Sequence, residues 1–499
     1  MPCHTDSRKI EQQPLKLSKN STFFSHKRPL TTIDICNFAH NMRQDNKTNQ
    51  FNVLAEKPIG SLLMQYAIPA IVAMAASSVY NIIDGIFIGQ GVGPEAIMGL
   101  ALTGPLMSLT AAFGAMVGVG AATLMSVKLG QKDYTTAQKI LGNVVIMNLT
   151  LGIVLGLVLV CFINPILRFF GASDVTLPYA RSFMSIILIG NVITHMYLGL
   201  NAMLRSTNRP QKAMYATFGT VILNCVFAPI FIFVLGWGIK GAAIATILAQ
   251  FTMLMWQIRL FSNKNELIHL SRKIIKLDMH LVGESLLVGL PQFLINLCAC
   301  LVAAMMTRSL TTYGGDMAVG SFGICNRLIL FIVMVVIGLN QGMQPIAGYN
   351  FGAKRYDRVL GVLKRALVFG TMITMVGFII GVFFSHPFVS LFAKDSPELI
   401  NMASHALSCM VMMFPIVGIQ IVSTAFFQSI GYAQKSIFLS LTRQLIFLVP
   451  AIFILPHIFN DPLEGLWHAA PVADGLASVL AITLLLLQVK KFKKLQDAA

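Results

Sequence analysis

Charged residues are scarce in this chain of 499 residues, because Asp, Glu, Lys and Arg together make up only 11% of it. Soluble domains usually carry roughly 25% charged residues. Hydrophobic residues instead account for 56% of the chain, much of it in long uninterrupted runs. This composition excludes an ordinary soluble enzyme and indicates an integral membrane protein.

Acidic residues are the scarcer of the two charge types, with 20 Asp and Glu against 37 Lys and Arg. Nucleic-acid binding would require the basic residues to gather on a soluble face. Here they lie in short loops between apolar segments, so membrane topology explains the excess and no nucleic-acid partner is expected.

Several motifs with known chemistry are also missing. The eight cysteines lack the paired spacing of a zinc site or a disulfide framework. The chain has no HExxH, GxSxG or GxxxxGK[ST] motif. We therefore expect no metal or cofactor and no enzymatic activity, although a membrane-embedded enzyme stays open as an alternative outside transport. Without an ATP-binding motif, an ion gradient is the expected energy source.

Twelve apolar segments are each long enough to cross a hydrocarbon core of about 30 Å as a helix. They run continuously apolar instead of alternating, which favours helices over a barrel. The predicted spans are 62–88, 97–124, 137–160, 176–200, 212–235, 240–260, 283–307, 318–343, 359–384, 397–425, 435–457 and 466–489.

Charge in the loops predicts the orientation. The loops after the even-numbered spans and the C-terminal tail hold most of the Lys and Arg. Positive residues stay on the cytoplasmic side, so both termini are expected to be cytoplasmic.

The predicted domain organisation is an N lobe, a linker, a C lobe and two tails. The first tail is polar, without an apolar signal-peptide core, and we expect it to be disordered, with Met42 an alternative start of translation. The boundaries are 1–61 for the N-terminal tail, 62–260 for the N lobe, 261–282 for the cytoplasmic linker, 283–489 for the C lobe and 490–499 for the basic C-terminal tail.

An internal repeat relates the two lobes. A shift of 222 residues pairs Pro69 with Pro291, Ala96 with Ala318, Gly120 with Gly342, and Gly130, Lys132 and Tyr134 with Gly352, Lys354 and Tyr356. A shift of 223 pairs Ser206 with Ser429. Six spans per lobe bring both lobes into the membrane from the same side, which predicts two pseudo-symmetric six-helix lobes and alternating access by rocking.

Ionisable residues inside predicted spans are candidates for function, because a charge at mid-bilayer costs roughly 2.5–3.5 kcal/mol or more. Asp84 is the one acidic residue within the first six spans. It can exchange a proton or help to ligate a small cation, or it can form a packing hydrogen bond.

Asp474 opens the last span, where it can cap the helix or pair with Arg443 or Arg327. We interpret His195 and His405 as packing residues.

Amide and hydroxyl side chains cluster in spans four to six: Asn191, Thr194, Asn201, Thr220, Asn224 and Thr246. Their oxygens can complete a cation shell or hold a carboxyl proton, and they can equally form interhelical hydrogen bonds. The predicted substrate or cavity lining comprises Asn81, Asn191, Gln341, Gln344, Arg327 and Asp474.

Four segments carry a family resemblance: Asp84–Gly89, Asn224–Phe233, Gly238–Thr246 and Gly338–Lys354. They resemble the multidrug and toxic compound extrusion (MATE) family. The last segment, together with Leu441–Gln444, is similar to its bacterial MepA-like branch. The resemblance implies a multi-pass antiporter of the bacterial inner membrane that expels cationic amphipathic compounds in exchange for protons or sodium.

The resemblance also implies an ion-coupling site in the N lobe. The family uses an aspartate in span one, an asparagine and an aspartate in span five and a threonine in span six. Asp84, Asn224 and Thr246 match three of these positions, but Ala228 replaces the second aspartate. Because a hard cation favours negative oxygen ligands, this departure favours proton coupling over sodium coupling.

The expected protein is therefore a monomeric, proton-coupled drug exporter with small cationic molecules and the lipid bilayer as its partners. Sodium coupling through Asp84, Asn224 and Thr246 and a flippase for a lipid-linked precursor are the alternatives within transport.

Overall fold

The computed structural model describes residues 53–271, 274, 276–391 and 396–497, and these residues form helices and connecting loops with no strand among them. Most of the N-terminal tail that we expect to be disordered lies outside this range, and so does Met42. In the first half, the helices are α2 (Ile59–Gly91), α3 (Pro94–Gly130), α4 (Tyr134–Cys161), α5 (Ile163–Phe169), α6 (Leu177–Ile189), α7 (Asn191–Ser206), α8 (Pro210–Pro229), the π-helix η1 (Ile230–Val234) and α9 (Gly238–Phe261).

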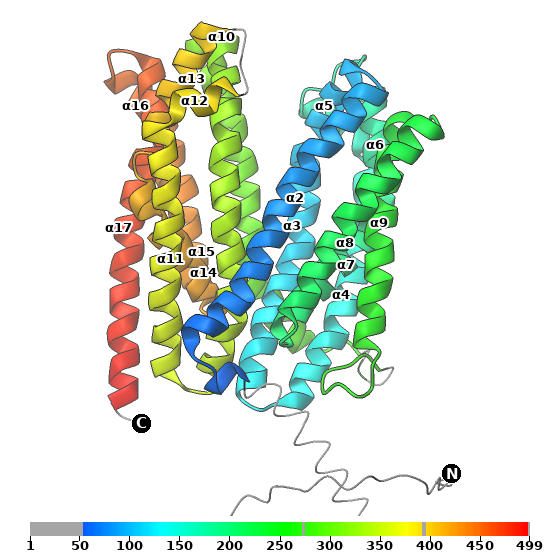
Figure 1. The fold of residues 1–499 in the computed structure, drawn as a ribbon, viewed down its shortest axis with the longest axis vertical. Coiled ribbons are helices and arrows are strands. Elements are labelled where there is room, and N and C mark those ends of the chain that lie inside the picture. Colours follow the sequence, from blue (N-terminus) through cyan, green and yellow to red (C-terminus); the bar gives the residue numbers. More distant parts are fainter. Residues whose placement is uncertain (1–52, 272–273, 275, 392–395, 498–499) are drawn as a thin grey trace, which may run out of the picture. The chain divides into compact units, whose positions relative to one another are not determined.

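The second half repeats this pattern. Its helices are α10 (Met279–Gly352), α11 (Tyr356–Phe383), α12 (Ser385–Ser390), α13 (Pro397–Met410), α14 (Phe414–Ser429), α15 (Ala433–Leu441), the π-helix η3 (Thr442–Leu448), α16 (Val449–Ile458) and α17 (Pro462–Asp497). Figure 1 shows α2–α9 grouped on one side and α10–α17 on the other.

Twelve membrane spans account for all of these helices except the short α5 and α12. Nine helical segments of the described chain are long and apolar enough to cross a membrane, and two bent pairs, α6 with α7 and α13 with α14, add one span each. The twelfth span comes from α10, whose 74 residues would extend about 110 Å at 1.5 Å per residue, far beyond one bilayer core. Gly315, with φ 63° and ψ −161°, breaks α10 into two spans.

The backbone carries the predicted repeat. Residues with positive φ recur at offsets of 222 or 223: Gly93 with Gly315, Lys132 with Lys354, and Asn208 with Gly431. The two bent pairs also match, since α6 and α7 meet at 55° and α13 and α14 at 56°. Two lobes with the same sequence of turns and bends are therefore present.

Three apolar clusters show how the lobes meet. One cluster combines residues of both halves, including Leu129 and Tyr349, beside the loops that hold most of the basic residues. The other two clusters each belong to one half, around Ile88 and around Trp467. We call the end of the helices that carries these basic loops the basic end, and the opposite end the far end. The lobes share a core at the basic end and have separate cores toward the far end.

Close packing of α3 on α10 depends on glycine. Gly120 lies against the backbone of Ser285 and Gly289, and a methyl group on Gly120 would overlap the Ser285 carbonyl oxygen. Such backbone contact is typical of helix pairs in membranes, where small residues allow close approach.

Two helix boundaries differ from those expected. Residues 53–56 form a helical turn and α2 begins at Ile59, because Leu54 is buried and its carbonyl oxygen accepts a hydrogen bond from Asn350. At the other end, α17 continues to Asp497 through the basic stretch, with Phe492 buried and stacked on Tyr356 at 5.3 Å between ring centroids.

Candidate functional site

Asp84 lies in α2 with 9% of its surface exposed. Its Oδ1 atom is buried and has no hydrogen-bond partner among the described residues. A buried polar atom normally has a partner, so an unpartnered carboxylate oxygen marks a place where a proton or cation can be held. Among the described residues of the first half, Asp84 is the only acidic residue that is buried.

Three neighbouring polar side chains satisfy one another. The amide nitrogen of Asn224 in α8 lies 3.0 Å from the hydroxyl of Tyr80 in α2 and 3.0 Å from that of Thr246 in α9. The two hydroxyl oxygens are 3.1 Å apart. Because an amide nitrogen only donates, both hydroxyl oxygens accept from Asn224. We call Tyr80, Asn224 and Thr246 the polar triad.

The remaining hydrogens of the triad can be assigned. Thr246 donates to the carbonyl oxygen of Ala242 at 3.1 Å, which leaves its oxygen to accept from the hydroxyl of Tyr80. Tyr80 precedes Asp84 by four residues, so the two side chains share a face of α2. The triad therefore ties α2, α8 and α9 together one helical turn from the carboxylate.

Tyr80 was not among the residues expected at this site. Its i, i+4 relation to Asp84 is the signal in the sequence that could have identified it.

Ala228 is fully buried one turn beyond Asn224 in α8. The described site thus holds one carboxylate where the family pattern has two.

Two of the predicted lining residues make contacts between the lobes. Gln341 and Gln344 of α10 reach across to the first half. Gln341 contacts Met74 Sδ at 3.7 Å, and Gln344 donates to the Val119 carbonyl oxygen at 3.1 Å and to Thr123 Oγ1 at 2.5 Å.

The two predicted lining asparagines lie in the first half. Asn191 is buried at the start of α7, and its Nδ2 atom has no partner among the described residues. The side chain of Asn81 is outside the described part.

A second polar feature lies inside the second half. Arg443 of η3 donates to Asp474 of α17 at 2.6 Å, and this pair lines a cavity of about 140 Å³. Because α17 begins at Pro462, Asp474 lies more than three turns inside the helix, so its interpretation as an N-cap is wrong. Arg327 is exposed on α10 and is not one of the residues lining this cavity.

The two histidines that we interpreted as packing residues differ. His195 has its Nε2 atom 2.9 Å from the carbonyl oxygen of Thr110 and is buried, as expected of a packing residue. The side chain of His405 is 56% exposed and pairs with Glu464, so its interpretation as a packing residue is wrong.

The fold and the site define a class of protein: a membrane transporter built from two repeated six-helix lobes. The MatE family model matches residues 69–230 and 291–454, one match in each lobe. The chain belongs to the MatE family, which consists of transporters and not of enzymes.

Individual relatives agree with this assignment. The multidrug export protein MepA of Staphylococcus haemolyticus is 26% identical over 436 residues, covering 87% of this chain and 95% of the relative. A structure of the MATE multidrug transporter DinF-BH is 32% identical with a TM-score of 0.80, covering 86% of this chain and 96% of that one. The outward-facing structure of a multidrug resistance MATE family transporter has a TM-score of 0.82 at 23% identity, covering 88% and 98% of the two chains.

Proposed function

We propose that the protein is a multidrug efflux antiporter that expels cationic amphipathic compounds across the bacterial inner membrane in exchange for protons. Membership of the MatE family and similarity to proteins named as multidrug exporters support export of small molecules. The observation that carries the coupling proposal is the buried carboxylate of Asp84, whose Oδ1 atom has no partner among the described residues.

The donors and acceptors around Asp84 support the proposal of proton coupling. The hydrogens of the polar triad are used within the triad and on Ala242. A sodium ion needs several oxygen ligands and favours negative ones, whereas a proton needs one carboxylate. With Ala228 where the family has a second aspartate, Asp84 suits a proton better than sodium.

The lobes provide the conformational change. In this proposal the basic end faces the cytoplasm, since loops rich in Lys and Arg stay on that side. The shared core closes the basic end, and the separate cores leave the lobes free to part at the far end. A proton arriving from outside neutralises Asp84, weakens the attraction for a cationic compound and favours its release. Return of the lobes then delivers the proton to the cytoplasm, so the two cations exclude each other by linkage.

The test is transport of a cationic dye into inside-out membrane vesicles under an imposed proton gradient or an imposed sodium gradient. Asp84→Asn keeps the size of the side chain and removes its titration. Asp174→Asn is the matched control, because Asp174 forms an exposed ion pair with Arg168 in a loop. We expect proton-driven transport by the wild type and the control and none by Asp84→Asn.

Other outcomes separate the alternatives. Proton-driven transport by Asp84→Asn at the wild-type rate would refute Asp84 as the proton carrier. Transport driven by sodium alone would mean that other oxygens complete a sodium site around Asp84. No dye transport under either gradient would favour a lipid-linked precursor as the cargo.

A further inference from the structure

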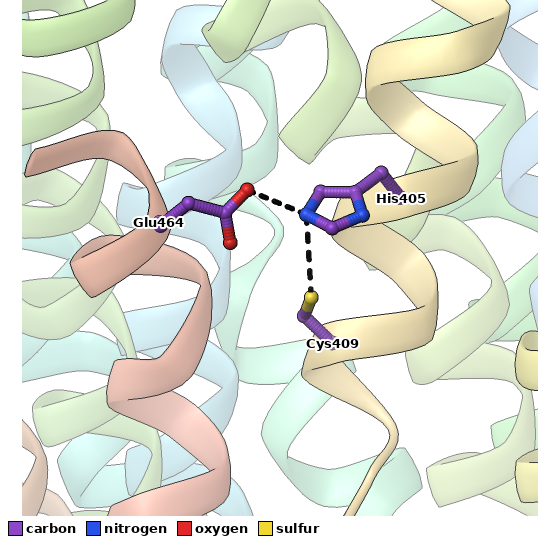
Figure 2. A group of neighbouring side chains, drawn as sticks. All are labelled: His405, Cys409 and Glu464. Carbon is purple, nitrogen blue, oxygen red and sulfur yellow. Dashed lines mark hydrogen bonds and ion pairs between the residues drawn. The ribbon is translucent and has the colours of Figure 1, made fainter. Parts of the chain in front are cut away.

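Three side chains with metal-binding atoms meet at the far end of the second half, away from Asp84. His405 and Cys409 lie one turn apart in α13, and Glu464 lies in the first turn of α17 (Figure 2). Their nitrogen, sulfur and oxygen atoms all lie within 4.8 Å of one another. The Nε2 atom of His405 is 2.5 Å from Glu464 Oε1 and 3.7 Å from Cys409 Sγ.

This trio of donors matches zinc. Zinc binds thiolate sulfur at about 2.3 Å and imidazole nitrogen at about 2.0–2.1 Å with tetrahedral geometry, so the two atoms lie roughly 3.5 Å apart across the ion. The separation between His405 Nε2 and Cys409 Sγ is 3.7 Å, close to that value. The carboxylate of Glu464 would withdraw from the imidazole by about 1 Å to admit the ion between them. No backbone movement is needed for this change, since a glutamate side chain can rotate.

The surroundings allow an ion to enter and then shield it. The side chains of His405 and Glu464 are 56% and 34% exposed, which leaves them open to solvent. Cys409 is buried at the base of the trio. Soft sulfur in a sheltered position, together with exposed nitrogen and oxygen, is a donor set that favours zinc over calcium or magnesium.

A neighbouring histidine extends the cluster. His468 follows Glu464 by one turn in α17, and its Nδ1 atom is 2.8 Å from the Glu464 backbone carbonyl oxygen. Because a carbonyl oxygen only accepts, Nδ1 carries the hydrogen, and Nε2 is the atom left for a metal or its water. The fourth position of a tetrahedral zinc is therefore filled by water or by His468 after a change of rotamer.

We propose that His405, Cys409 and Glu464 form a zinc-binding site that fastens α13 to α17. Both helices also line the cavity of about 140 Å³, through Met410 in α13 and Ala470 and Asp474 in α17. Bound zinc fixes the spacing of these two walls. The site needs neither the ion-coupling role of Asp84 nor the transport of any compound, so it stands apart from the proposed function.

The test measures zinc binding by the full-length protein in detergent after metal removal. Zinc is titrated in competition with a chromophoric chelator, and cobalt is titrated separately to detect a cobalt–thiolate charge-transfer band. We expect one zinc ion per chain, a rise in the melting temperature with zinc, and a thiolate band with cobalt. His405→Gln, Cys409→Ser and Glu464→Gln should each weaken zinc binding at least tenfold, and Cys409→Ser should abolish the band.

Matched controls change similar residues elsewhere. His457→Gln and Asp461→Asn alter exposed groups near the end of α16 and the loop after it, and Cys161→Ser alters an exposed cysteine in the first half. These three variants should bind zinc as the wild type does. His405→Gln and Glu464→Gln change side chains that are partly open to solvent, so they keep the test valid if Cys409→Ser fails to fold.

The proposal is overturned if the wild type binds no zinc under these conditions. It is overturned equally if the site variants retain wild-type affinity, or if the cobalt complex of the wild type lacks the thiolate band. In those cases His405 and Glu464 form only an ion pair.

Discussion

The side-chain amide of Asn224 donates a hydrogen bond of 3.0 Å to the hydroxyl oxygen of Tyr80, and this bond joins α8 to α2 one turn before Asp84. The same amide donates to Thr246 in α9 at 3.0 Å. A single side chain therefore holds together three helices beside the carboxylate. Loss of one of its acceptors should therefore alter the position of α2 beside Asp84, the proposed ion-coupling residue.

Replacing Tyr80 with Phe should destabilise the protein by about 1–3 kcal/mol, because it leaves a buried amide hydrogen of Asn224 without an acceptor. We also expect slower proton-driven dye transport, since α2 is no longer tied to α8 at this point. Thermal unfolding in detergent and vesicle transport measure the two effects. Tyr215→Phe removes a hydroxyl from an exposed position in α8 and should leave both unchanged. Equal behaviour of the two variants would contradict a role for the triad.

Replacing Ala228 with Asp should create sensitivity to sodium. The new carboxylate would lie one turn from Asn224 in α8 at a fully buried position, where a charge requires a counterion. We expect sodium to raise the melting temperature of Ala228→Asp and to leave that of the wild type unchanged. Ala228→Asn has the same size without the charge and serves as the control. A sodium-dependent rise in the wild type would instead indicate that sodium already binds beside Asp84.

The fold was largely predictable because its determinants are local. Long continuous apolar runs require helices in a bilayer, and twelve of them followed from length alone. The offset of 222 between Lys132 and Lys354 predicted the repeat that their shared positive φ confirms. The break at Gly315 lies between the predicted spans 283–307 and 318–343, whereas the bend between α6 and α7 falls inside the single predicted span 176–200 and was not predicted.

The sites were less predictable because they depend on how each helix is rotated about its axis. Asp84, Asn224 and Thr246 were expected together from the family resemblance, but only packing brings Tyr80 onto Asn224 and Thr246. His405 and Glu464 are 59 residues apart in sequence and show no common motif. Their meeting depends on the packing of α13 against α17, which periodicity within one helix does not specify.

We expect substitutions of Arg443 and Asp474, which form an ion pair, to have non-additive effects on stability. Asp474 is buried, with its Oδ1 atom 2.6 Å from Arg443 Nε, so Asp474→Asn leaves a largely enclosed guanidinium without its counterion. Loss of one partner of a buried pair costs about 3–5 kcal/mol, and we expect somewhat less here because 27% of the Arg443 side chain is exposed.

A double-mutant cycle tests this coupling. Arg443→Met and Asp474→Asn should each lower the melting temperature, and the double variant should lose less than the sum of the two losses. Arg308→Met, at an exposed position of α10, is the control for loss of a guanidinium. Additive losses would mean that the pair contributes no interaction energy of its own.

Hydrogen bonds from Arg358 hold the two halves together at the basic end. Its guanidinium donates to Asn350 Oδ1 at 3.1 Å and to the backbone carbonyl oxygens of Leu54 at 3.2 Å and Lys57 at 2.7 Å. Arg358 and Asn350 belong to the second half, whereas Leu54 and Lys57 lead into α2 of the first. The proposed alternating access requires these lobes to separate at the basic end, so in that proposal these hydrogen bonds break in each cycle. Each bond to a charged group contributes about 1.5–3 kcal/mol, and each 1.4 kcal/mol changes an equilibrium roughly tenfold.

Arg358→Met should therefore expose the segment before α2 at least tenfold more often. Leu54 is 1% exposed, so a cysteine placed there by Leu54→Cys reports opening through its rate of reaction with a membrane-permeant maleimide. We expect that rate to rise at least tenfold when Arg358→Met is added. Arg365→Met is the matched control, because the Arg365 guanidinium donates to the Gly361 carbonyl oxygen within the same helix. Equal labelling with and without Arg358 would show that the shared apolar core, and not this guanidinium, keeps the basic end closed.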